Sequence, residues 1–129
     1  MKIAVVGSRT LQIPDLESYL PPQTSEIVSG GAKGIDQCAA QCAERNGWKL
    51  TEFLPEYSRY GRAAPVIRSR RIVEYADAVL AFWDGCSRGT AHTIEYCRKI
   101  GREVRIICIQ TDPNGRDFAV GGSAQDLTL

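Results

Sequence analysis

The chain has 129 residues, of which 43% are hydrophobic and 24% charged, and its formal net charge is +1. This length suits one domain with a buried core. The nearly balanced charge excludes a strong overall electrostatic attraction to nucleic acid or to a membrane surface. No apolar run approaches the length of a membrane span and no secretory signal opens the sequence, so we expect a cytoplasmic protein.

The sequence contains five cysteines and one histidine, and no two cysteines have the CxxC spacing. Structural zinc sites draw on clusters of Cys and His at short spacing, so we expect no metal site. The odd number of cysteines favours reduced, mostly buried thiols.

Apolar runs alternate with helical patterns in chain order. We predict strands over residues 2–6, 26–29, 49–55, 77–83 and 103–110, and helices over residues 13–20, 34–46, 66–75 and 87–101. The helix at 34–46 has the clearest apolar stripe, with Ile35, Cys38, Ala39, Cys42 and Ala43 on one face. Residues 56–65 are expected to form a loop, and residues 110–129 an irregular tail or a segment packed on a partner.

This alternation predicts an α/β fold of the Rossmann-like, doubly wound type. The sheet is expected to have five mainly parallel strands, with helices on both faces joined by right-handed crossovers. We expect residues 1–109 to form one domain, which binds its ligand beyond the carboxyl ends of the strands, where the strand order reverses.

Small, hydroxylated and cationic residues follow three of the predicted strands. They are "GSR" at residues 7–9, "SGGAKGID" at residues 29–36 and "DGCSRGT" at residues 84–90. Two of these stretches lead directly into helices, whose N-terminal N–H groups attract anions when glycines leave room. A tight turn with close helix packing is the alternative for Gly34, and Asp36 is expected either to accept from a ribose hydroxyl or to cap its own helix.

An arginine cluster adds further cations. Arg68 and Arg71 are three residues apart and are expected to share a helix face toward the ligand, whereas Arg70 is expected to pair with Glu74. The candidate ligand-binding residues are Gly7, Ser8, Arg9, Gly30, Gly31, Lys33, Asp36, Arg68, Arg71, Asp84, Ser87, Arg88, Gly89 and Thr90.

Three blocks of the sequence resemble the SLOG superfamily, which unites the DNA-processing protein A (Smf) family with the Lonely Guy phosphoribohydrolases. The blocks are "GSR", "SGGAKGID" and "RSRRIVEYADAVLAFWDGCSRGTAHTIE", and the last is similar to the small YpsA-related single-domain branch. The resemblance covers roughly residues 2–109. It implies a nucleotide or nucleotide-derived ligand without a required cofactor, favours a homo-oligomer, and places phosphate near Gly30, Gly31, Ser87, Gly89 and Thr90.

Three functions follow from these observations. The first is a module that binds a nucleotide-like small molecule as a sensor or carrier. The second is a nucleoside 5'-monophosphate phosphoribohydrolase, in which Glu95 is the candidate carboxylate. The related hydrolases carry a glutamate where this chain has Thr93, and helical geometry predicts that Glu95 points away from the same pocket. The third is binding of single-stranded DNA through the arginine cluster, beside Tyr57 and Tyr60.

Overall fold

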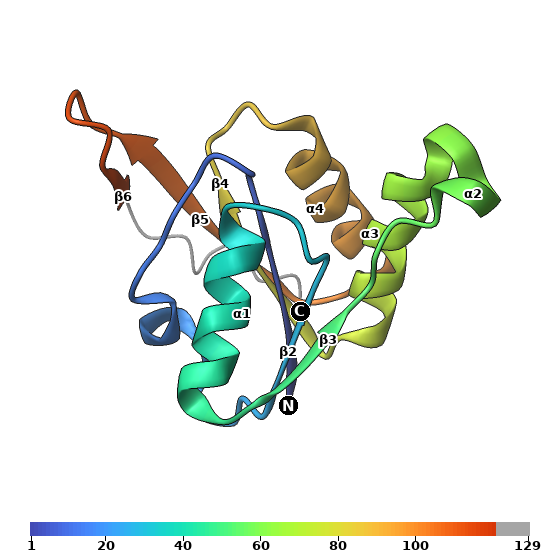
Figure 1. Cartoon of the computed structure of the whole chain (residues 1–129), viewed down its shortest axis with the longest axis horizontal. Helices are drawn as coiled ribbons and strands as arrows, with labels where there is room; N and C mark the ends of the chain where they lie inside the picture. The colour runs from blue at the N-terminus through green and yellow to red at the C-terminus, as the bar shows by residue number, and fades with distance from the viewer. Residues whose placement is uncertain (121–129) are drawn as a thin grey trace.

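A computed structural model describes residues 1–120 of the chain. One six-stranded sheet runs through it in the order β3-β2-β1-β4-β5-β6 (Figure 1). The first five strands in the chain are parallel and β6 is antiparallel to β5. The strands are β1 (Lys2–Gly7), β2 (Glu26–Ser29), β3 (Lys49–Glu52), β4 (Ala78–Trp83), β5 (Val104–Thr111) and β6 (Asp117–Ala119).

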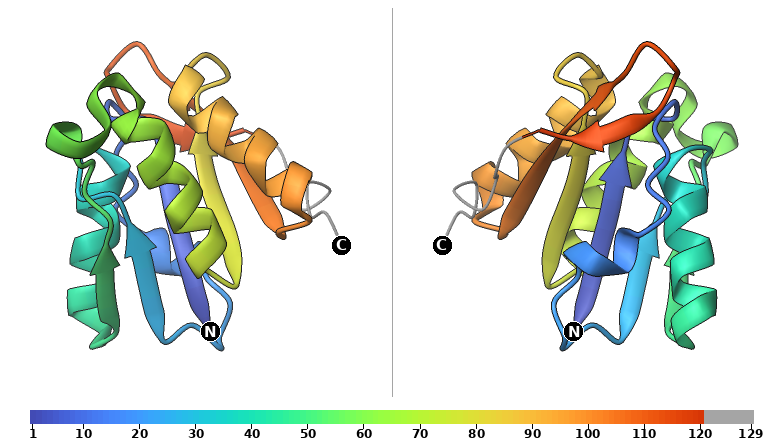
Figure 2. Two further views of the ribbon diagram at one scale, coloured as in Figure 1. Left: turned by 90° about the vertical axis from the view of Figure 1, so that its right-hand side faces the viewer. Right: turned by 90° about the vertical axis from the view of Figure 1, so that its left-hand side faces the viewer.

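Helical segments cover both faces of the sheet (Figure 2). The short 3-10 helix η1 (Leu16–Tyr19) and α1 (Ile35–Asn46) pack on one face, around a core that includes Phe82 and Ile107. On the other face lie α3 (Ala64–Tyr75) and α4 (Arg88–Ile100), around a core that includes Val73 and Cys97. Two short turns, α2 (Tyr57–Tyr60) and η2 (Gly61–Ala63), precede α3.

The predicted α/β, doubly wound and mainly parallel architecture is confirmed, and its five strands lie within the predicted segments to within one residue. A sixth strand, β6, was not predicted, because it is three residues long and follows the turn formers of residues 112–116. Part of the predicted irregular tail therefore belongs to the sheet, and residues 121–129 lie outside the described part of the chain.

Two helix predictions were wrong in extent. Residues 13–20 form only the four-residue η1, because Pro14 and Pro21 enclose a segment too short for a stable α-helix. The predicted loop at 56–65 contains α2 and η2, and α3 begins at Ala64 with Pro65 in its first turn, where proline is favoured.

No helix within residues 1–120 is long and apolar enough to cross a membrane.

The strand order reverses at β1, which pairs with β2 on one side and β4 on the other. The segments that leave β1 and β4 therefore diverge and open a crevice between them. One glycine fixes the wall of this crevice: Gly34 has a φ of 70° and a Cβ on it would lie 2.3 Å from the carbonyl oxygen of Arg9. The start of α1 is thus in backbone contact with the segment after β1.

We predict that Gly34→Ala destabilises the protein far more than Gly101→Ala. Both glycines have positive φ, but a Cβ on Gly101 would meet nothing within 4 Å, so only the left-handed backbone penalty of about 1–2 kcal/mol applies there. At Gly34 the clash with the Arg9 backbone adds to this penalty, and we expect a loss of several kcal/mol. Urea unfolding of both variants measures the difference, and equal losses would contradict the tight contact.

Candidate functional site

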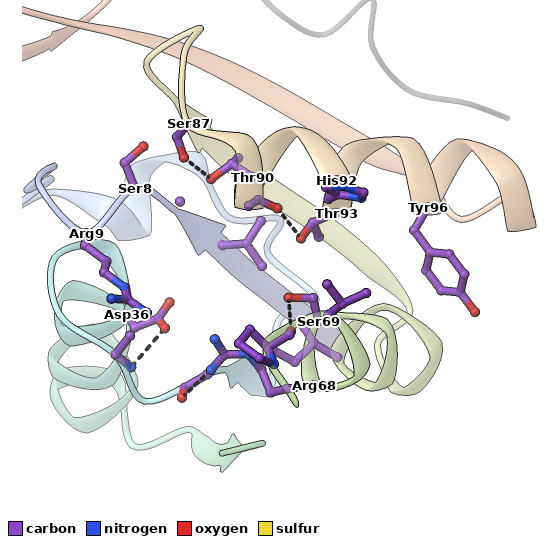
Figure 3. Close-up of a pocket in the computed structure, with 18 of the residues that line it drawn as sticks. Ser8, Arg9, Asp36, Arg68, Ser69, Ser87, Thr90, His92, Thr93 and Tyr96 are labelled. Atoms are coloured by element: carbon purple, nitrogen blue, oxygen red, sulfur yellow. Dashed lines mark hydrogen bonds between the residues drawn. The ribbon is translucent and has the colours of Figure 1, made fainter. Parts of the chain in front are cut away.

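A cavity of about 710 Å³ opens beyond the carboxyl ends of β1, β2 and β4 and extends between α3 and α4 (Figure 3). Such a volume lies within the range of ligand pockets. The structure brings most of the sequence-predicted site residues to its walls: Gly7, Ser8, Arg9, Gly30, Asp36, Arg68, Asp84, Ser87, Gly89 and Thr90.

The N-terminus of α4 forms one wall of the cavity. Ser87 is the N-cap residue in extended conformation, and the N–H of Ala91 donates to its carbonyl oxygen. The N–H groups of the three residues between them have no partner within the helix. A Cβ on Gly89 would meet no atom within 4 Å, so the approach to these donors is open. This end of α4 therefore presents donors and a positive helix dipole to the cavity.

A buried serine hydroxyl lies beside this helix end. Ser8 follows β1 directly, is only 6% exposed and lies near Ser87 (Figure 3). Its Oγ makes no well-formed hydrogen bond with the residues that the structure describes, although the Asp84 carboxylate, whose ionised form it favours, lies nearby. Leaving a buried hydroxyl unpaired costs about 1–3 kcal/mol, so an acceptor in the cavity would stabilise this arrangement.

Asp84 organises the loop between β4 and α4. Its Oδ1 accepts from the N–H groups of Cys86 and Ser87, both at 2.8 Å. Burial opposes its ionisation, but these two hydrogen bonds and the nearby Ser8 hydroxyl outweigh it and lower the pKa of Asp84 below 3.8. The ionised carboxylate thus holds the loop just before the helix and leaves the first N–H groups of α4 itself unoccupied.

The turn before α1 is arranged differently. Asp36 Oδ2 accepts from the N–H of Ala32 at 3.0 Å, and Arg68 Nη1 donates to the carbonyl oxygen of Gly30 at 2.9 Å. Burial raises the pKa of Asp36, while the Ala32 N–H and the Arg68 charge act in the opposite direction. Asp36 therefore holds the turn that precedes α1. The predicted cap on its own helix is wrong, because Gly34 occupies the N-cap position and no side chain bonds there. The alternative role, a contact with a ribose hydroxyl, stays a prediction.

Four predicted residues do not line the cavity. Gly31, Lys33 and Arg88 are exposed and outside its lining, because the turns that carry them face solvent. Arg71 points toward α2, where it pairs with Glu56 at 3.4 Å and donates to the hydroxyl of Tyr60 at 3.0 Å. The prediction that Arg68 and Arg71 share a ligand-facing side was wrong, because the roughly 60° between them on the helix is enough to separate their partners.

The cavity also includes residues that sequence reasoning missed or misplaced. His92, Glu95, Tyr96 and Lys99 of α4 line it, so the expectation that Glu95 points away was wrong. The reason is that the cavity runs along α4 and takes in a broad strip of its surface. The helical spacing of these four residues was the signal that could have revealed the strip.

Arg70 of α3 also lines this cavity, on the side opposite α4. It stacks over the ring of Tyr96 at 5.2 Å, and the Tyr96 hydroxyl in turn donates to the carboxylate of Glu74. The expected direct pairing of Arg70 with Glu74 is thus replaced by an aromatic ring between them.

Within residues 1–120, no group of three or more Cys, His, Asp or Glu side chains could hold a metal ion.

These features define a Rossmann-like domain with a cavity at the topological switch point. No family model and no curated protein matches the chain. The X-ray structure of DNA processing protein A from Streptococcus pneumoniae is similar to it, with a TM-score of 0.64 and 25% sequence identity. The match covers 97% of this chain but only 59% of that protein. It supports the SLOG superfamily, to which the three sequence blocks pointed.

We predict that Asp84→Ala destabilises the protein by about 1 kcal/mol near neutral pH, because two loop N–H groups lose an acceptor that solvent only partly replaces. The pKa of Asp84 is lowered in the folded state, so its contribution is complete above 3.8 and is lost as pH falls below that value. Unfolding curves of both proteins from pH 6 to pH 2.5 test this. A difference in stability that does not shrink in acid would contradict the assigned role.

Proposed function

We propose that this chain binds a nucleotide or nucleotide-derived molecule in the switch-point cavity, as a sensor or carrier. The observation that carries the proposal is the unpaired, buried hydroxyl of Ser8 beside the open N-terminus of α4. A phosphate oxygen is an acceptor for both kinds of donor, and the helix dipole favours its negative charge.

The rest of the cavity suits the remainder of such a ligand. Beyond the α4 terminus its walls combine the apolar side chains of Val66 and Ile72 with the polar groups of Ser69 and His92. Mixed walls of this kind bury a base or sugar and orient it with a few hydrogen bonds. We further propose that the chain belongs to the YpsA-related branch, because the third sequence block is similar to that branch.

We predict that Ser8→Ala weakens binding of inorganic phosphate and of adenosine monophosphate by about tenfold or more. A hydrogen bond to a charged group contributes about 1.5–3 kcal/mol. The alanine variant should fold because the native hydroxyl makes no well-formed hydrogen bond within the protein and loses only its weak interaction with Asp84. Titration calorimetry measures the affinities.

Ser69→Ala is the matched control. Ser69 lines the same cavity, but its hydroxyl already donates to the carbonyl oxygen of Pro65 at 3.0 Å. Its loss should therefore leave phosphate affinity within about twofold. Equal affinities of wild type and Ser8→Ala would remove the Ser8 hydroxyl from the binding site and with it the observation that carries the proposal.

Binding of single-stranded DNA is the second candidate, favoured by the likeness to DNA processing protein A. In this chain, an exposed tyrosine, Tyr57, and two exposed arginines, Arg59 and Arg62, gather on α2 and η2. Aromatic faces beside cations are the usual platform for single strands. This surface is separate from the lining of the cavity, so the two candidates can be distinguished.

For this candidate, the expected result is that Arg59→Ala/Arg62→Ala weakens binding of a labelled oligothymidylate several-fold, with a shallower salt dependence, because two phosphate contacts are lost. Fluorescence anisotropy at two salt concentrations measures both quantities, and Ser8→Ala serves as the cavity control. The DNA candidate fails if neither variant changes DNA affinity or if the wild type does not bind the oligonucleotide. Neither outcome affects the small-molecule proposal.

A further inference from the structure

The two helix N-termini at this end of the sheet differ in what occupies them. Before α4, Asp84 binds only N–H groups that precede the helix. Before α1, the carboxylate of Asp36 lies on the turn itself and accepts from the Ala32 N–H at 3.0 Å. A negatively charged group of the protein therefore already uses the turn that the glycines would open to a phosphate.

Arg68 encloses this turn from α3. Its Nη1 donates to the Gly30 carbonyl oxygen, and a Cβ on Gly30 would lie 2.3 Å from that nitrogen and 3.1 Å from Asp36 Oδ2. The guanidinium and the carboxylate thus approach the same backbone position from two elements. The cation that could attract a second anion here is balanced by Asp36, and both side chains line the cavity.

We infer that Asp36 is a specificity-determining residue that excludes phosphate groups from the α1 turn of the cavity. This inference rests on the proposed function, which places the ligand's phosphate at Ser8 and α4. A ligand phosphate that reaches this turn would meet a carboxylate where it needs donors, and like charges at short range repel.

Asp36→Asn tests the inference, because asparagine keeps an acceptor oxygen for the Ala32 N–H but removes the charge that offsets Arg68. The probe is inorganic phosphate, and the readout is the amide signals of Ala32 and Gly89 in ¹⁵N-resolved NMR titrations. In wild type we expect phosphate to shift the Gly89 signal and leave that of Ala32 in place. In Asp36→Asn we expect both signals to shift, with phosphate affinity at the turn at least tenfold above wild type.

Glu52→Gln is the matched control for charge. The Glu52 carboxylate lies near the same turn, 3.5 Å from a Cβ on Gly31, but it is not among the residues that line the cavity. We expect this variant to behave as wild type. If it opened the Ala32 site as Asp36→Asn does, general charge rather than the position of Asp36 would govern access, and the inference would be wrong.

The remaining outcomes separate the two claims. A phosphate-dependent shift of Ala32 in wild type would overturn the inference even if Asp36→Asn failed to fold. An Asp36→Asn protein that folds but gains no site at Ala32 would also overturn it. Absence of a Gly89 shift in every variant would instead reject the proposed function, while the Ala32 signal would still report on Asp36.

Discussion

The backbone of residue 34 touches the backbone of residue 9, and the geometry of the whole cavity depends on that contact. It joins the segment after β1 to the start of α1, the helix that connects β2 to β3. The end of β1 and the beginning of α1 are therefore fixed relative to each other. Gly7 tightens the same junction, because a Cβ there would lie 2.6 Å from Ile35. Ser8, between these two glycine contacts, is thereby held in a buried position near Ser87, the N-cap residue of α4 (Figure 3).

The cavity is consequently asymmetric in charge. On its α4 side the Ser8 hydroxyl makes no well-formed hydrogen bond with any residue from 1 to 120, while on its α1 side Asp36 and Arg68 both bond to the turn and offset each other's charge. Two glycine-rich turns that look equivalent in the sequence thus perform different physical tasks. A Cβ on Gly89 at the start of α4 would meet no atom within 4 Å, whereas Gly30 and Gly34 leave space for the Arg68 side chain and the Arg9 backbone.

Periodicity made the fold predictable, because buried parallel strands such as β4 read as continuous apolar runs and helices such as α4 carry apolar stripes. The gathering of Ser8, Asp36 and Asp84 at one end of the sheet followed from the same reasoning. The direction of a single side chain did not follow. Whether Arg71 turns to a ligand or to Glu56 depends on α2, a four-residue helix in a segment without helical periodicity. The missing partner of Ser8 is likewise a property of the packed structure.

The two edges of the sheet are unequal in kind but alike in length. On one side lies β3 with four residues, and on the other the antiparallel β6 with three. At about 3.3 Å per residue, each exposes roughly 10–13 Å of backbone to an approaching chain. Such short strands offer few unpaired backbone groups to which another strand could add. Each also begins with a charged residue, Lys49 in β3 and Asp117 in β6. β6 pairs only with residues 109–111 of β5, so within the part of the chain that the structure describes the outer side of residues 104–107 is a further stretch of open sheet edge, and strand addition would be directed there.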